Sequence, residues 1–258
     1  MSAPRRARVI ETRALTPQMI RVVLGGDELQ GFGTGEFTDH YVKLRIAERT
    51  RTYTVRDWDG ERLTIDFVVH GDEGVAGPWA AAAQPGDELE LRGPGGAYTP
   101  DPHADWHLMV GDSSVIPAIA ASLARIPAGV PVHVLVAVAG PEEEQPLTTR
   151  GDLQLRWLPD DAALVAAVAD LDFPPGSVHA FVHGEASAVR ELRRHLLVDR
   201  GLPREALSVS GYWKRTRTEE GWREDKAEWN RLVEEDAGEH RPRGPGSLAG
   251  VRPEGETR

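Results

Sequence analysis

The chain has 258 residues, a formal net charge of −11 and no cysteine. The length suits two modest domains, and the negative charge disfavours a nucleic-acid partner, because a phosphate backbone would repel the molecule. The lack of cysteine excludes disulfides, thiolate metal sites, iron–sulfur clusters and cysteine nucleophiles, so redox chemistry would have to come from a bound organic cofactor.

The N-terminal segment argues against export. Residues 1–8 are basic but lead directly into Val9 and Ile10, without the apolar stretch of a signal peptide. No later apolar run is long enough to span a bilayer. We therefore expect a cytoplasmic protein without stable membrane insertion, and we take a monomer as its state.

The first half of the chain is predicted to be an antiparallel β-barrel. Its segments are short, rich in β-branched residues and separated by Gly, Pro or Asp, which is typical of barrel strands. The predicted strands cover residues 19–24, 41–46, 63–69 and 88–91. We therefore expect a β-barrel domain over residues 1–100, followed by a linker near 93–104 that is rich in glycine and proline.

The second half alternates apolar strands with helical runs. Strands are predicted at 107–110, 132–138 and 178–182, and helices at 115–126 and 186–198. This alternation predicts a parallel sheet with crossover helices in an α/β domain over residues 101–233. Ligands of such a sheet bind beyond the carboxyl ends of its strands, here at residues 111–114, 139–142, 183–186 and 210–215.

The end of the chain is predicted to change from a helix to a disordered tail. Glu219, Glu220, Trp222 and Trp229 have the spacing of an amphipathic helix that packs back onto the body. Residues 234–258 contain glycine, proline and charge with almost nothing to bury, so we expect them to be disordered.

Arg51-Thr52-Tyr53-Thr54, at the start of a predicted strand, are the first candidate cofactor contacts. On a strand, Arg51 and Tyr53 share one face, where a guanidinium can neutralise a pyrophosphate and a phenol ring can cover a flavin. An ordinary strand with a surface arginine and a core tyrosine explains the same residues. Their position favours the first interpretation, because Arg-x-Tyr-(Thr/Ser) in a barrel before a doubly wound half resembles the ferredoxin-reductase-like flavoproteins.

Further motifs make the chain similar to the siderophore-interacting protein family, also described as NAD(P)H-dependent ferric-siderophore reductases. The resemblance extends to about residue 230. Its motifs are a second flavin motif at 66–80, Gly93-Pro94-Gly95-Gly96-Ala97-Tyr98, the segment 105–119, Gly184-Glu185-Ala186, and Ser210-Gly211-Tyr212-Trp213-Lys214-Arg215. Each motif is weak or moderate alone, and their order and spacing make the combination strong.

The chain departs from the family pattern at two places. It has Gly74-Val75-Ala76 where the family commonly has Gly-Pro-Ala, and Gly111-Asp112-Ser113-Ser114 where the family has Gly-Asp-Glu-Thr. The first change restores a backbone N–H that proline lacks. The second removes a carboxylate beside the expected flavin and nicotinamide region, which leaves the local charge and the cofactor preference open.

The resemblance implies which residues hold FAD. These are Arg51, Tyr53, Thr54, Val68, His70, Gly74, Ala76 and Trp79. Taken alone, the segment 74–80 can present several N–H groups to a phosphate, or it can be a surface turn with Trp79 in the core. The resemblance favours the first interpretation.

A second group is expected to contact the nicotinamide cofactor, NADH or NADPH, or to complete the flavin site. Its members are Asp112, Ser113, Ser114, Gly184, Glu185, Ala186, Arg190, Tyr212 and Trp213. Gly184-Glu185-Ala186 follows a buried strand and opens a helix, where a dinucleotide phosphate or a nicotinamide can rest. Arg190, Arg193 and Arg194 either pair with a 2′-phosphate or are solvated helix arginines.

Four cations are candidates for substrate binding, and no metal ligand is expected. Ferric siderophores are often anionic and bulky, so cations beside aromatic surface suit them, although a charge run that caps a helix is an equal explanation. The four are Lys43, Lys214, Arg215 and Arg217. Residues 101–107 alternate Asp and His, but Pro102 and the lack of a second ligand cluster favour a loop that leads into a strand.

The resemblance implies a reductase that passes electrons from NADH or NADPH through FAD to a ferric siderophore and releases ferrous iron in the cytoplasm. The flavin carries the chemistry, so no catalytic residue is required. Two alternatives stay open. One is a general flavin reductase with a protein or free-flavin acceptor, and the other is a non-enzymatic protein that binds siderophore or stores flavin.

Overall fold

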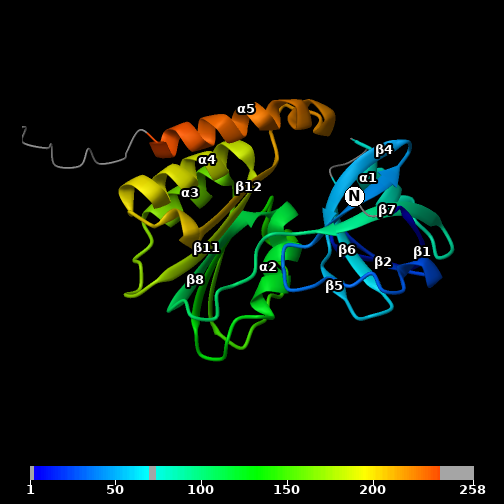
Figure 1. Ribbon diagram of the computed structural model, residues 1–258, viewed down its shortest axis with the longest axis horizontal. Coiled ribbons are helices and arrows are strands. Elements are labelled where there is room, and N and C mark those ends of the chain that lie inside the picture. The colour runs from blue at the N-terminus through cyan, green and yellow to red at the C-terminus, as the bar shows by residue number, and fades with distance from the viewer. Residues whose placement is uncertain (1–2, 70–73, 239–258) are drawn as a thin grey trace, which may run out of the picture.

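The computed structural model describes residues 3–69 and 74–238, in which an antiparallel and a parallel sheet lie side by side (Figure 1). His70, an expected flavin contact, lies outside the described residues. The antiparallel sheet has the strand order β4-β3-β7-β1-β2-β6-β5. Its elements are β1 (Arg5–Thr16), β2 (Met19–Gly25), β3 (Tyr41–Ile46), β4 (Arg49–Thr54), β5 (Asp57–Trp58), β6 (Leu63–Val68), the short helix α1 (Ala76–Ala82) and β7 (Glu88–Gly95).

The hairpin of β3 and β4 orients Arg51. Along β3, Val42 and Leu44 are buried while the residues between and beside them are exposed, which is the alternation of a half-buried strand. The turn at Ala47 and Glu48, both with positive φ, joins the strands in a register that pairs Leu44 with Arg51. Paired residues share a face, so Arg51 points to the inner face of the sheet. It lies in the middle of β4, which begins before the predicted motif.

The antiparallel sheet curls so that distant strands share one core. The Tyr53 ring on β4 lies 4.3 Å from the Phe67 ring on β6, and the Phe67 ring lies 5.5 Å from that of Trp79 on α1. In the strand order, β4 and β6 are well separated, so this contact requires a strongly curved sheet. β4 and β5 are the two edges of the hydrogen-bonded ladder, so the predicted antiparallel β-barrel has the form of a strongly curved sheet.

The parallel sheet has five strands in the order β10-β9-β8-β11-β12. The elements of this half are β8 (Trp106–Asp112), α2 (Ile116–Leu123), β9 (Pro131–Ala137), β10 (Asp152–Leu158), α3 (Asp161–Ala169), β11 (Val178–Glu185), α4 (Ala186–Arg194), β12 (Leu207–Trp213) and α5 (Glu219–Gly238). From β8 the chain winds outward to β10 and then returns to the other side of β8. The strand order therefore reverses between β8 and β11, which is where open α/β sheets bind their ligands.

Helices cover both faces of the parallel sheet, as the alternating pattern predicts. One face packs on α2 through Ile119, and the other packs on α3 and α4 through Val168 and Leu192. Met19 of β2 and Tyr98 belong to the same apolar cluster as Ile119. The two sheets therefore share a buried apolar interface.

Polar contacts join the two sheets as well. Glu143, which is buried beyond the end of β9, accepts hydrogen bonds from the hydroxyl of Thr16 and from the backbone N–H of Gln18, the latter at 3.0 Å. The hydroxyl oxygens of Thr38 and Ser122 lie 2.8 Å apart. These contacts fix the orientation of one sheet against the other.

Helix α5 packs on α4 and β12, which confirms the amphipathic helix expected at the end of the chain. Trp222 and Trp229 are buried against Ala186 and Val189, and the Trp229 indole N–H donates to the carbonyl oxygen of Ala186 at 3.0 Å. No helix in the described part of the chain is long and apolar enough to cross a membrane.

The expectation of disorder from residue 234 onward is wrong at its start, because α5 continues to Gly238. Glu234 forms ion pairs with Arg204 and, at 3.5 Å, with Arg193. Arg193 is buried and also donates to the carbonyl oxygen of Val233. These contacts extend the helix through a charged segment. Residues 239–258 lie outside the described part.

Buried histidines in the parallel sheet predict a pH-dependent stability. Burial lowers the pKa of His107 to about 4. An unfolded chain would titrate it near its ordinary pKa of about 6.5, so the unfolded state binds more protons and stability present at neutral pH is lost as the pH falls below that value. We expect His107→Phe to reduce the slope of unfolding free energy between about pH 6 and pH 5 by about 1 kcal/mol per pH unit.

Urea unfolding at several pH values measures this slope. The matched control is His103→Asn, because His103 is exposed and should leave the slope as it is. An unchanged slope in His107→Phe would show that folding does not depress the His107 pKa.

Candidate cofactor site

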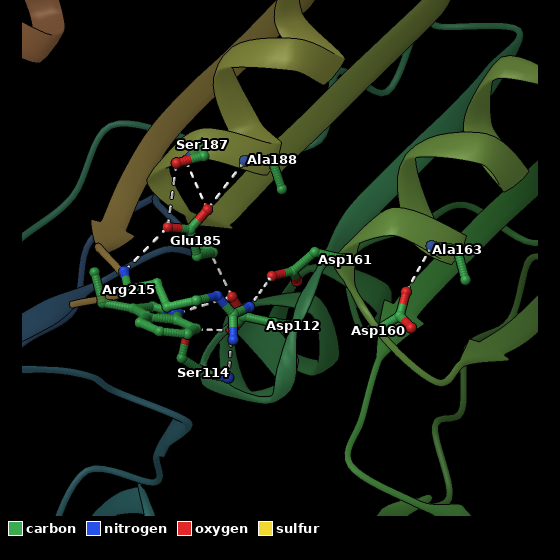
Figure 2. A network of polar contacts seen from close by, with 10 residues as sticks. Asp112, Ser114, Asp160, Asp161, Ala163, Glu185, Ser187, Ala188 and Arg215 are labelled. Carbon is green, nitrogen blue, oxygen red and sulfur yellow. Dashed lines mark hydrogen bonds and ion pairs between the residues drawn. The ribbon is translucent and has the colours of Figure 1, made fainter.

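The buried carboxylate of Asp112 joins the carboxyl ends of β8, β11 and β12 (Figure 2). Its Oδ1 accepts hydrogen bonds from the backbone N–H and the hydroxyl of Ser114, at 2.8 and 2.5 Å. Its Oδ2 accepts from the backbone N–H of Glu185 and the indole N–H of Trp213, both at 2.8 Å. Burial raises the pKa of Asp112, and these donors act in the opposite direction. Asp112 therefore organises the point where the strand order reverses.

Glu185 caps the helix that follows β11. Its carboxylate accepts hydrogen bonds from the backbone N–H groups of Ser187 and Ala188, at 2.6 and 3.1 Å, and from that of Arg215 at 3.1 Å (Figure 2). The N-terminal N–H groups of α4 therefore already have an anionic partner. This geometry does not support the expectation of a phosphate at Gly184-Glu185-Ala186, because a phosphate there would have to displace Glu185.

Trp213 exposes its ring at the same edge of the sheet. Trp213 is 36% exposed, and the Arg215 guanidinium lies 5.6 Å from the centroid of its ring. Nη2 of Arg215 also lies 2.5 Å from Oδ2 of Asp161, which begins α3 (Figure 2). Asp112, Glu185 and Arg215 thus position the Trp213 ring beyond the carboxyl ends of the strands.

Exchanging Asp112 for asparagine tests this arrangement. Asp112→Asn keeps the size of the side chain but replaces one carboxylate oxygen with an NH2 group. That group would face the N–H or O–H donors whose hydrogen bonds the carboxylate oxygen accepts. We expect a loss of about 2 kcal/mol in the free energy of unfolding and faster hydrogen exchange of the Trp213 indole N–H. Urea unfolding and NMR exchange measure the two effects. Asp172→Asn, at an exposed position, is the control and should change stability by less than about 0.5 kcal/mol.

Residues of the Arg-x-Tyr-Thr motif meet β12 across the two sheets. Thr54 is buried, and it lies close enough to the side chain of Tyr212 to lower the pKa of that phenol. Burial raises the pKa of Tyr53 and of Tyr212, so both phenols stay protonated at neutral pH. Thr54 of the motif and Tyr212, far apart in the sequence, therefore lie close together.

Arg51 lies beside Tyr53 on the inner face of β4 and is only 7% exposed. Its Nη1 lies 2.7 Å from Oε1 of Glu220, and its Nε lies 3.0 Å from Oε2 of Glu219. Both carboxylates belong to the first turn of α5. Burial, and to a smaller extent the charge of Glu219, raises the pKa of Tyr53.

The remaining expected flavin residues surround α1. Val68 ends β6, Ala76 begins α1, and Trp79 packs on the Phe67 ring. Gly74 has a φ of 76°, a left-handed conformation that favours glycine at the approach to α1. These residues adjoin the same core as Tyr53.

The remaining residues expected to bind the nicotinamide or the substrate lie at several places in the structure. Ser113 opens the short turn that follows Asp112, and Lys43 is exposed on β3. Arg190 and Lys214 line a cavity of about 700 Å³ between α4 and α5. Arg217 forms an ion pair with Asp225 of α5 at 2.7 Å. Lys43, on β3, and Lys214, directly after β12, come from different halves of the chain.

The sequence indicated Glu219 and Glu220 only as parts of a packing helix, and it gave no role to Asp161. No spacing rule connects Arg51 to carboxylates about 170 residues later in the chain, because the pairing depends on how the two sheets are placed. A surplus of carboxylates at the start of a helix is a general feature of helices, so it carried no specific signal.

The residues present fit a flavin with a pyrophosphate. A buried guanidinium that already holds two carboxylates is a site for an anion, and the Tyr53 ring on the same face offers an aromatic surface. The Thr54 and Tyr212 hydroxyls supply polar groups beside it. The two helix starts differ. At α4 the Glu185 side chain caps the helix, whereas at α1 the N-cap residue is Val75, and no side-chain hydrogen bond caps the helix within the described residues.

Family models match both halves of the chain. A model described as siderophore-interacting FAD-binding domain matches residues 8–50 and 47–98. A model described as siderophore-interacting protein matches residues 104–216. The boundary between the matches coincides with the change from the antiparallel to the parallel sheet.

Relatives match over most of their length. Ferric vibriobactin reductase ViuB of Vibrio cholerae is 33% identical over 86% of this chain and 94% of its own. The NADPH-dependent ferric-chelate reductase of Escherichia coli is 28% identical, with 81% and 92% covered. The crystal structure of a siderophore utilization protein from T. fusca has a TM-score of 0.75 and 35% identity, over 84% of this chain and 94% of that one.

Proposed function

The chain belongs to the siderophore-interacting protein family, and we propose that it is a flavin-dependent reductase that transfers electrons from NADH or NADPH through FAD to ferric iron in a siderophore. The names of the Vibrio and Escherichia relatives support both the electron donor and the acceptor. The release of ferrous iron in the cytoplasm is part of the same proposal.

The observation that carries the proposal is the meeting of the flavin motif with the edge of the parallel sheet. Thr54 lies close enough to Tyr212 to lower the pKa of that phenol, so the segments that hold Tyr53 and Trp213, from different sheets, lie near each other. A flavin at Tyr53 would then face the edge where α/β sheets bind dinucleotides. Trp213, fixed by Asp112, would cover the site from the side of the parallel sheet.

FAD, when bound, would supply redox chemistry that the side chains lack, because a flavin can take up hydride from a nicotinamide and can donate single electrons to ferric iron. The chain's own residues bind and orient. Arg51 would neutralise the pyrophosphate, and the Tyr53 ring would pack on the flavin. Siderophore oxygens are hard ligands that suit ferric iron better than ferrous iron, so reduction weakens the complex.

The acceptor site is proposed on charge. In a chain with a net charge of −11, an anionic ferric siderophore needs local cations. Lys43 and Lys214 lie at the antiparallel and the parallel sheet respectively, and we assign them to substrate binding. Arg215 and Arg217 already hold Asp161 and Asp225, so their first role is to position the segment after Trp213.

Anaerobic stopped-flow mixing tests the function. The FAD-loaded protein is expected to lose its visible flavin absorption on mixing with NADH or NADPH and to regain it on mixing with a ferric siderophore. A flavin that stays oxidised with both nicotinamides would favour the non-enzymatic alternative. A flavin that is reduced but is not reoxidised by any ferric siderophore would favour a reductase with a protein or free-flavin acceptor.

Charge reversal at the two lysines tests the acceptor site. We expect the double variant Lys43→Glu and Lys214→Glu to lower kcat/KM for a ferric siderophore by about tenfold, because two attractive charges become repulsive. Reduction of a neutral dye should stay unchanged in the same variant. An equal loss with both acceptors would contradict a substrate role of the lysines.

A further inference from the structure

The arginine assigned to the flavin pyrophosphate is engaged by the chain itself. Nη1 of Arg51 donates to the carbonyl oxygen of Thr50 at 3.0 Å and to Oε1 of Glu220 at 2.7 Å. Its Nε lies 3.0 Å from Oε2 of Glu219, and only 9% of its side chain is exposed. Nε and Nη1, two of the three guanidinium nitrogens that can bind a pyrophosphate, therefore already face carboxylates.

Two further arginines support the contact between α5 and β4. Nη1 of Arg49 lies 3.6 Å from Oε2 of Glu220. Nη2 of Arg223 lies 3.3 Å from Oε1 of Glu219 and donates to the carbonyl oxygen of Thr50 at 3.2 Å. The first turn of α5 is thus attached to the antiparallel sheet by charged groups and one backbone contact.

From Trp222 onward, α5 is held by contacts that do not involve Glu219 or Glu220. Trp222 packs over Gly211 of β12, where an added Cβ would lie 2.9 Å from the indole ring, and Trp229 is hydrogen-bonded to Ala186. Figure 1 shows α5 extending from above α4 and β12 toward β4. The first turn can therefore release Arg51 while the apolar contacts of the helix remain.

A pyrophosphate bound by this guanidinium would have to share it with the two carboxylates. Arginine has five N–H donors in a fixed fork, and like charges brought together in a partly buried site repel each other strongly. The pyrophosphate of FAD adds negative charge beside Glu219 and Glu220, which are only 30% and 43% exposed. Binding of the cofactor must therefore weaken the contact between Arg51 and α5.

We propose that Glu219 and Glu220 compete with the FAD pyrophosphate for Arg51, so that docking of the first turn of α5 and binding of FAD oppose each other. The inference rests on the proposed function, because it takes the cofactor site assigned there. It adds that α5 sets the affinity for FAD: the carboxylates keep Arg51 paired until the cofactor displaces them.

Titration of the FAD-free full chain with FAD tests the competition. The double variant Glu219→Gln and Glu220→Gln keeps the shape of both side chains and removes both charges. We expect it to bind FAD about tenfold more tightly than the unaltered chain, because the guanidinium is no longer held by carboxylates. The matched control, Glu224→Gln with Glu235→Gln, makes the same charge change at exposed positions of α5 and should leave the affinity unchanged.

Weaker or equal FAD binding in the Glu219→Gln and Glu220→Gln variant would overturn the competition and leave the proposed function intact. Weaker binding would mean that the carboxylates orient Arg51 for the cofactor. Absence of FAD binding in the unaltered chain and in both variants would overturn the proposed function itself.

Hydrogen exchange gives a second readout that does not depend on activity. If the two partners compete, addition of FAD should speed the exchange of the backbone N–H groups in the first turn of α5, around Glu220 to Arg223. The segment around Trp229 should keep its protection, because its apolar contacts are not disturbed. Slower exchange in the first turn on addition of FAD would contradict the proposal.

Discussion

Arg51→Ala is expected to weaken FAD binding by about a hundredfold or more. The substitution removes the buried guanidinium proposed to hold the pyrophosphate, and truncating one partner of a buried charge pair costs roughly 2–5 kcal/mol. It also leaves Glu219 and Glu220 facing each other without their shared cation. Titration of the FAD-free protein, followed by flavin fluorescence, measures the loss.

Two matched variants sharpen this prediction. Arg45→Ala removes an exposed arginine of the same hairpin, paired with Glu48, and should leave FAD affinity unchanged. Arg51→Lys keeps the charge but not the planar fork and should lie between the two, at about a tenfold loss. Full FAD affinity in Arg51→Ala would remove this arginine from the cofactor site.

Gly184→Ala is expected to destabilise the parallel-sheet domain by about 3 kcal/mol or more. Gly184 has a φ of 130°, and a Cβ there would lie 2.5 Å from Oδ2 of Asp112. That oxygen accepts hydrogen bonds from the backbone N–H of Glu185 and the indole N–H of Trp213. The clash would therefore break the contacts that position the Trp213 ring. Urea unfolding measures the loss of stability.

Gly129→Ala is the control for this substitution. Gly129 has a φ of 75°, but an added Cβ would meet no atom within 4 Å. It should therefore cost only the backbone strain of about 1–2 kcal/mol. Equal losses in the two variants would show that the contact with Asp112 is not what requires glycine at position 184.

Much of the parallel sheet was predictable because its central strands are buried on both faces. The apolar runs of β8, β9 and β11 were recognised for that reason, and their carboxyl ends do converge at Asp112 and Glu185. β10 was not predicted, because it is an edge strand whose residues alternate between exposed and half-buried. α3, whose N-cap is Asp160, was missed with it.

The long first strand, β1, was missed for a related reason. Over most of its length its side chains are exposed or half-buried, so the segment lacks the apolar content of a core strand. Its position in the middle of the sheet comes from pairing with β2 and β7. Hydrogen bonding by the backbone does not appear in the side-chain pattern.

The polar contacts of the site were the least predictable. Helix N-caps are mostly Ser, Thr, Asp or Asn, so nothing in the sequence marked Glu185 as the cap of α4. The contact of Arg51 with Glu219 and Glu220 depends on the relative placement of the two sheets and on the path of α5. The motif indicated that Arg51 binds an anion but not that the chain supplies one.

Retention of FAD by the purified protein tests the account most directly. The chain is incubated with FAD, desalted, and the flavin absorbance is compared with the protein concentration. The site at Arg51 and Tyr53 predicts one FAD per chain and a yellow protein. A colourless protein that does not bind FAD at micromolar concentrations would contradict the assignment of the flavin site and the electron transfer proposed from it.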